Sequence, residues 1–103
     1  MRLYDLHTEY GDYRVCVKLA RYGYDGSLCV ELITDKGEPY CRLTACLGDK
    51  SLGHDESYVD TNSCPFAESF IVSNGLGEFI GEHGRSGFCE YPVCRFDIAA
   101  LTA

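Results

Sequence analysis

Residues 10–37, YGDYRVCVKLARYGYDGSLCVELITDKG, contain three turn sequences that separate runs rich in β-branched and aromatic residues. The turns lie at 10–12, 24–27 and 34–37. Three turns imply four strands, which we expect at 2–9, 12–21, 27–34 and 39–47. Because links this short join antiparallel neighbours, the first half of the chain predicts an antiparallel meander.

Side chains alternate between the two faces of a strand, so the order of apolar residues predicts which face is buried. In the second strand Arg14, Cys16 and Lys18 share the more polar face. The apolar residues of the opposite face are Tyr13, Val15, Val17 and Leu19, followed in the third strand by Leu28, Val30 and Leu32. One face of the sheet should therefore be covered and the other solvated.

The second half offers one good helix candidate, at 65–74. Pro65 suits the first position of a helix, and Asn74 with Gly75 suits its left-handed end. Its apolar stripe, able to cover the sheet, consists of Phe66, Ala67, Phe70 and Ile71. A polar loop at 48–62, with a short strand at 57–60, precedes the helix.

After the helix, five glycines between positions 75 and 87 are expected to break the chain into short pieces before a last strand at 88–98. Pro92 cannot donate to a strand ladder, so this strand should lie at an edge or carry a bulge. The sequence thus predicts an α+β fold in one domain, 1–103. The fold consists of an antiparallel β-sheet of five to six strands with one helix packed on one face.

The seven cysteines suggest a reducing compartment, because their number is odd and the first residues, MRLYD, lack the apolar run of an export signal. We expect a cytoplasmic protein without membrane association, whose cysteines behave as small buried hydrophobic residues. A composition with 46% hydrophobic residues is enough for a single core without disulfides.

The net charge of −7 is unevenly distributed, because no Lys or Arg occurs between Lys50 and Arg85. That interval contains Asp55, Glu56, Asp60, Glu68, Glu78 and Glu82. A field of one sign repels phosphate backbones, so direct nucleic-acid binding is not expected. It would attract a basic protein partner; alternatively, the acids serve only solubility.

Motifs for catalysis are weak. Cys41 with Cys46, and Cys89 with Cys94, could supply four zinc ligands, but an offset of five within a strand sends paired side chains to opposite faces. Cys64 at the helix start could act as a nucleophile only if His54 or His83 reached it. We therefore assign no catalytic residue, metal or cofactor.

Two further features are consistent with contact surfaces. The loop 82–88, EHGRSGF, combines charge, glycine and an aromatic residue, and a solvated hairpin connection is the alternative explanation. Tyr4, Tyr10, Tyr13, Tyr22 and Tyr24 crowd the first quarter of the chain. Tyrosine is common at binding surfaces, and also in strands generally.

The sequence resembles a small family of unknown function encoded on conjugative and other mobile elements of Gram-positive gut bacteria. The resemblance rests on DTNSCPFAESF at 60–70, NGLG at 74–77, RSGFCEYP at 85–92 and RFD at 95–97. LYD at 3–5 and GYDG at 23–26 extend it to nearly the whole chain. The resemblance implies the kind of genetic element that encodes the protein but no activity, because the family has no catalytic residue that could be carried over to this sequence.

Small acidic proteins of such elements include anti-CRISPR inhibitors of the type II RNA-guided nuclease, which holds nucleic acid in a basic channel. The resemblance therefore implies an inhibitor whose acids replace phosphates. The expected contact residues are Asp55, Glu56, Asp60, Glu78, Glu82, His83 and Arg85. The alternative is an accessory protein of the element that binds a conjugation or maintenance protein through an exposed sheet edge. A zinc protein with Cys41, Cys46, Cys89 and Cys94 as ligands is the third reading.

Overall fold

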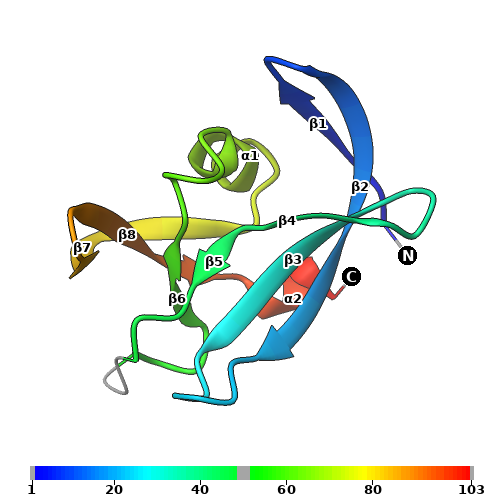
Figure 1. Cartoon of the computed structure of the whole chain (residues 1–103). Helices are drawn as coiled ribbons and strands as arrows, with labels where there is room; N and C mark the ends of the chain where they lie inside the picture. The colour runs from blue at the N-terminus through cyan, green and yellow to red at the C-terminus, as the bar shows by residue number, and fades with distance from the viewer. Residues whose placement is uncertain (1, 49–51, 103) are drawn as a thin grey trace.

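The computed structural model describes residues 2–48 and 52–102. Within these residues the chain forms eight strands in two four-stranded sheets, together with two short helices (Figure 1). Every strand pair is antiparallel. The predicted α+β class and antiparallel pairing are confirmed. The prediction of a single sheet of five to six strands with one helix is wrong in the number of sheets, strands and helices.

The first sheet is the predicted meander, with its strands in chain order. The buried face is the predicted one, since Val15, Val30 and Leu32 are fully buried. Gly26 and Gly37 have positive φ angles of 74° and 83°, which the two later turns require. The strands are β1 (Tyr4–Thr8), β2 (Gly11–Arg21), β3 (Leu28–Thr34) and β4 (Pro39–Arg42).

The segment predicted as one strand at 39–47 passes from the first sheet to the second. β4 pairs with β3, whereas β5 (Thr44–Ala45) pairs with β6 (Glu56–Val59). Between them, the Leu43 N–H donates to the Val30 carbonyl at 2.9 Å, and the Leu43 carbonyl accepts from the Asp60 N–H at 2.7 Å. This change of partner is what divides the strands into two sheets.

The second sheet has the order β5-β6-β8-β7. The segment β7 (Gly77–Ser86) is the strand that the sequence analysis missed, because its glycines were expected to interrupt the chain. β8 (Cys89–Phe96) agrees closely with the predicted strand at 88–98. It lies between β6 and β7 and is therefore not an edge strand.

The predicted bulge near Pro92 is present, in the partner strand. Phe79 pairs with Cys94 and His83 pairs with Pro92, so three β7 residues lie opposite Val93 alone. Gly81, within this bulge, has a φ of 83°. The β6–β8 register runs from Glu56 opposite Arg95 to Tyr58 opposite Val93, so it ends before Pro92. The missing N–H of the proline therefore breaks no pairing with β6.

The helix α1 (Ala67–Ser73) falls within the predicted range, and its apolar stripe faces the core: Ala67, Phe70 and Ile71 are buried. Pro65 precedes the helix by one turn residue rather than occupying its first position. The helix ends as predicted. Gly75 has a φ of 66°, its N–H donates to Val72, and the Leu76 N–H donates to Ile71 at 3.0 Å, which is a Schellman motif.

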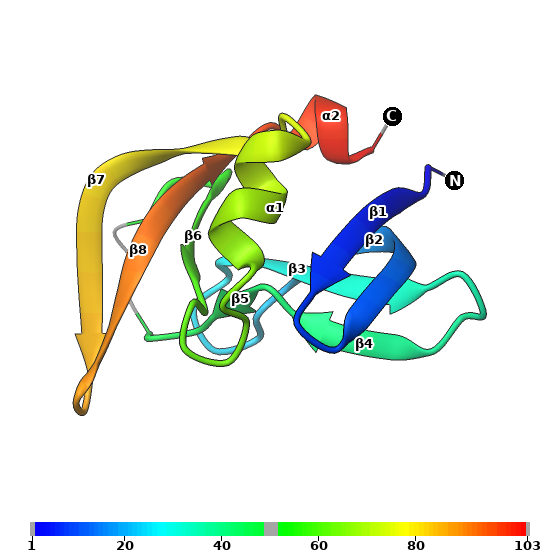
Figure 2. The same cartoon turned by 90° about the horizontal axis from the view of Figure 1, so that it is seen from above.

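The core lies between the two sheets, with α1 covering one side (Figure 2). Phe70 packs edge-on against Tyr4 of β1, with ring centroids 5.9 Å apart. The short helix α2 (Ile98–Leu101) follows β8, and its N-cap Asp97 accepts a hydrogen bond from the Ala100 N–H at 3.1 Å. None of the helices in the described parts of the chain is long and apolar enough to cross a membrane.

Candidate functional site

Strands β6, β8 and β7 place Glu56, Arg95 and Glu78 directly opposite one another. The Arg95 guanidinium lies 3.3 Å from a Glu56 carboxylate oxygen and 3.4 Å from one of Glu78. Folding therefore brings Arg95 of β8 next to acids from the part of the sequence that contains no Lys or Arg. Because Arg95 and Glu78 are substantially exposed, their ion pair orients the two side chains but adds little to the stability of the fold.

A groove of about 550 Å³ opens beside this row. Its backbone is well anchored: the Asp55 carbonyl accepts from the Phe96 N–H at 2.7 Å, and Arg21 donates to the His54 carbonyl at 2.6 Å. Three carboxylates and one guanidinium line the groove, so it keeps a negative charge. We call it the acidic groove; its lining is His54, Asp55, Gly75, Gly77, Glu78, Arg95, Phe96, Asp97 and Ile98.

The β7–β8 hairpin carries a second set of charges. Glu90 lies 3.6 Å from both the His83 ring and the Arg85 guanidinium. Glu82 lines a groove of about 430 Å³ together with His83, Glu90 and Glu68 of α1. The hairpin projects away from the first sheet (Figure 2), and Phe88 at its tip is fully exposed.

The seven residues predicted to contact a partner thus fall into three places. Asp55, Glu56 and Glu78 belong to the acidic groove and its row, whereas Glu82, His83 and Arg85 belong to the hairpin. Asp60 has a local role, because its carboxylate accepts from the Ser63 N–H at 3.0 Å in the turn before α1. All seven lie in the second sheet or next to it.

The four cysteines considered as zinc ligands have different surroundings. Cys94 is fully buried, and burial, with a smaller contribution from Glu78, raises its pKa to about 12. Cys46 neighbours the Asp25 carboxylate, Cys89 neighbours Tyr91, and Cys41 neighbours Cys64. In residues 2–48 and 52–102, no three His, Cys, Asp or Glu side chains are grouped to hold a metal ion. The zinc reading therefore lacks an assembled ligand set.

The Cys64 thiol, considered as a nucleophile, donates to the Arg42 carbonyl at 3.5 Å and neighbours the Cys41 thiol. The two histidines suggested as bases have other neighbours: His54 lines the acidic groove and His83 pairs with Glu90. The neighbour of the Cys64 thiol is therefore the thiol of Cys41.

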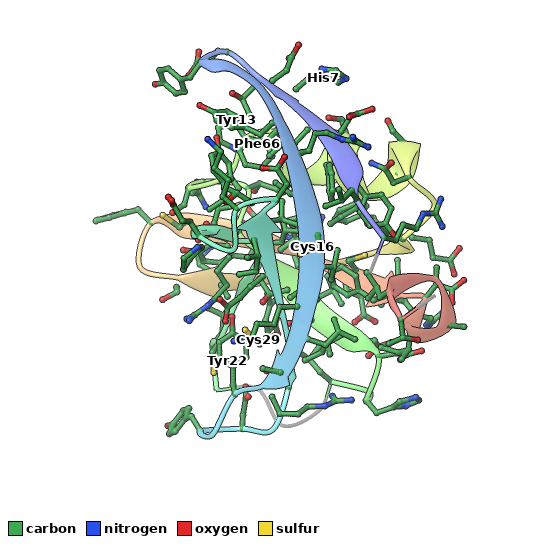
Figure 3. All side chains as sticks on the ribbon, turned by 90° about the vertical axis from the view of Figure 1, so that its right-hand side faces the viewer. His7, Tyr13, Cys16, Tyr22, Cys29 and Phe66 are labelled. Carbon is green, nitrogen blue, oxygen red and sulfur yellow. The ribbon has the colours of Figure 1, made fainter. Side chains whose placement is uncertain are left out.

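A second groove, of about 730 Å³, was not foreseen from the sequence. It lies between the β1–β2 turn, β4 and the segment before α1, and we call it the aromatic groove. The Tyr40 ring packs at a tilt of 40° against Tyr13, with centroids 4.8 Å apart, and its centroid lies 6.1 Å from that of Phe66. Tyr13, Phe66 and His7 gather at the same end of the molecule (Figure 3). The lining is His7, Thr8, Glu9, Tyr10, Tyr40, Cys41, Ser63, Pro65 and Phe66.

A β-bulge in β4 builds one wall of the aromatic groove. Leu32 pairs with Cys41 while Ile33 pairs with Pro39, which leaves Tyr40 as the extra residue. In such a bulge two successive residues lie opposite one partner residue, so Tyr40 and Cys41 can both face the groove. The crowding of tyrosines near the N-terminus was the available signal for this surface, since Tyr10 and Tyr13 both contribute to it.

At the rim of this groove His7 and Asp12 form an exposed ion pair, with the ring nitrogen 2.9 Å from the carboxylate. The hydrogen bond and charge of Asp12 raise the pKa of His7 above its usual value.

The chain belongs to the family described as Domain of unknown function (DUF4313), whose model matches residues 16–103. Neither a curated protein nor a solved structure matches it. The family agrees with the resemblance noted above in having no assigned function.

Proposed function

We propose that this member of the DUF4313 family is a non-catalytic binding protein whose acidic groove engages a basic protein partner. The observation that carries the proposal is the lining of the groove. Asp55, Glu78 and Asp97 supply three carboxylates against the single guanidinium of Arg95. With a chain charge of −7, the groove presents a negative field to a Lys- or Arg-rich surface.

The ion pairs of Arg95 are arranged so that an arginine of the partner could take the place of Arg95 at one carboxylate on binding. Arg95 bridges Glu56 and Glu78 at 3.3 and 3.4 Å, and its side chain is about half exposed. A partner arginine could replace it at Glu78, whose side chain is 72% exposed, while Glu56 keeps Arg95. The acidic groove lies at the open end of the β7–β8 hairpin and the exposed Phe88 at its far tip, so Phe88 would serve as an apolar anchor for a partner that spans the hairpin.

For the class of partner we propose a type II RNA-guided nuclease, blocked at its basic nucleic-acid channel. This step rests on the resemblance to proteins of mobile elements and on charge complementarity. The contact residues in this proposal are Asp55, Glu56, Asp60, Glu78, Glu82, His83 and Arg85, all on or next to the second sheet. No direct binding to nucleic acid is proposed.

The test compares two charge-reversed variants for binding to a guide-loaded type II nuclease at low and moderate salt. Asp55→Lys with Glu78→Lys reverses the acidic groove. Asp35→Lys with Glu38→Lys makes the same change of charge at the β3–β4 turn, away from the β7–β8 hairpin (Figure 1). We expect the groove variant to lose capture and inhibition and the turn variant to keep most of both. Equal losses would mean that net charge alone acts, and salt-independent capture would contradict the electrostatic mechanism.

A second candidate is the accessory protein of a mobile element that adds a strand to a partner. The observation that favours it is the edge position of β1 in the first sheet. Recovery of a conjugation or maintenance protein at both salt concentrations, with the nuclease absent, would favour this function. The N–H groups of alternate residues in β1 point outward from the edge, and a proline at such a position should then weaken capture.

A further inference from the structure

Two of the seven cysteines meet across the wall of the aromatic groove. Cys41 lies in the β4 bulge, and Cys64 lies in the segment before α1. Their thiols are neighbours, and each shifts the pKa of the other. Other contacts agree with this placement. The Cys64 sulfur lies 3.5 Å from the carbonyl oxygen of Arg42, the residue after Cys41. Cys41 also lines the groove together with Ser63 and Pro65, the two neighbours of Cys64.

The two thiols are not equivalent. Cys41 is half-buried and borders the open groove, whereas Cys64 is only 2% exposed. The neighbouring Cys41 thiol lowers the pKa of Cys64, against the effect of burial, whereas the neighbouring Cys64 thiol and burial raise the pKa of Cys41. Cys64 is therefore the thiol of the pair that loses its proton more readily, and Cys41 holds its proton more tightly, which is the arrangement of a nucleophile beside a resolving thiol.

We propose that Cys41 and Cys64 form a peroxide-sensitive dithiol that closes to an intramolecular disulfide. A small oxidant suits the site because Cys64 is only 2% exposed while its neighbour Cys41 borders the open groove. Cys64 loses its proton and its sulfur attacks one oxygen of hydrogen peroxide, the O–O bond breaks, and the departing hydroxide takes up that proton to become water. This leaves a sulfenic acid on Cys64.

In the second step the Cys41 sulfur loses its proton and attacks the Cys64 sulfur. The S–O bond breaks, and the departing hydroxyl leaves as a second water when it takes up the proton. In sum, two thiols lose two electrons to one peroxide, which is reduced to two waters. A dithiol reductant reverses the bond by thiol–disulfide exchange. The disulfide ties β4 to the segment that leads into α1, and so fixes two walls of the aromatic groove.

The experiment treats the folded full-length protein with one equivalent of hydrogen peroxide, blocks remaining thiols with N-ethylmaleimide, and maps the peptides by mass spectrometry. We expect the main product to lack two hydrogen atoms, to join Cys41 to Cys64, and to return to the starting mass with dithiothreitol. Cys41→Ser should stop at a Cys64 sulfenic acid that dimedone traps, and Cys64→Ser should not form the bond.

The matched control is Cys46→Ser, because Cys46 is also half-buried but neighbours the Asp25 carboxylate rather than a thiol. This variant should still form the Cys41–Cys64 disulfide at the rate of the unmodified protein. A map in which other cysteines pair first, or in which peroxide leaves Cys41 and Cys64 as thiols, would overturn the proposal. The map of the unmodified protein decides this even where a variant fails to fold.

Discussion

Gly77 lies where β7 begins, opposite Phe96 of β8 and in the lining of the acidic groove. A methyl group at this position would sit 2.7 Å from the Arg95 carbonyl oxygen and 2.8 Å from the Cys94 sulfur. It would also lie 3.1 Å from the Phe96 Cα. These neighbours are backbone atoms and a fully buried thiol. Gly77→Ala therefore forces the two strands to separate locally instead of moving a flexible side chain.

The expected loss of stability follows from two opposing effects. Inserting a methyl group into a packed interior costs about 1–3 kcal/mol in the free energy of unfolding. Replacing glycine by alanine restricts the unfolded chain and returns about 0.4–1 kcal/mol. The net loss for Gly77→Ala is then about 1–2 kcal/mol. With an m value of about 1–3 kcal/mol per molar urea, the unfolding midpoint should fall by roughly 1 M.

The assay is urea unfolding followed by far-ultraviolet circular dichroism, with Gly23→Ala as the matched control. A Cβ at Gly23 meets nothing within 4 Å, and Gly23 does not have a positive φ. Its alanine variant should be unchanged or up to about 1 kcal/mol more stable. A Gly77→Ala protein with an unchanged or higher midpoint would show that β7 and β8 are not packed as described.

Three further predictions concern the core, the ion pair of β1 and the buried thiol. Ile71→Ala should lower the free energy of unfolding by about 2–5 kcal/mol, whereas Val72→Ala, on the exposed side of the same helix, should change it by less than about 0.5 kcal/mol in a parallel denaturation. An NMR titration should give His7 a pKa above 6.5 that falls towards this value in Asp12→Asn. The protonated pair then favours folding below pH 6.5, and this contribution is lost as the pH rises through the folded-state pKa. Cys94, with a pKa of about 12, should resist iodoacetamide in the folded protein near pH 8 and react on unfolding; rapid alkylation of the native protein would contradict its burial.

The elements that the sequence predicted well depend on neighbouring residues. Turn chemistry at 24–27 and 34–37 predicted β2, β3 and the start of β4, and the Asn74–Gly75 end with the Phe70–Ile71 stripe predicted α1. These signals act over a few residues and need no knowledge of distant partners. Pro92 gave a correct expectation of a bulge for the same reason, although the extra residues lie in β7.

The features that escaped prediction depend on partners far along the chain. β7 contains several glycines and has no clear alternation, so only its pairing with β8 makes it a strand. The pairing register also brings Arg95 between Glu56 and Glu78, which a count of charges along the sequence cannot reveal. Likewise, Cys41 meets Cys64 only because the β4 bulge and the turn before α1 converge on one groove.

The passage of the chain through Leu43 has a consequence for how the protein opens. One residue donates to β3 and accepts from the end of β6, so strand pairs in both sheets are anchored by the same peptide units. Loosening either sheet therefore weakens the other. Amide protons on both sides of this crossing should exchange with solvent through one shared opening, as a single cooperative unit rather than as two independent halves.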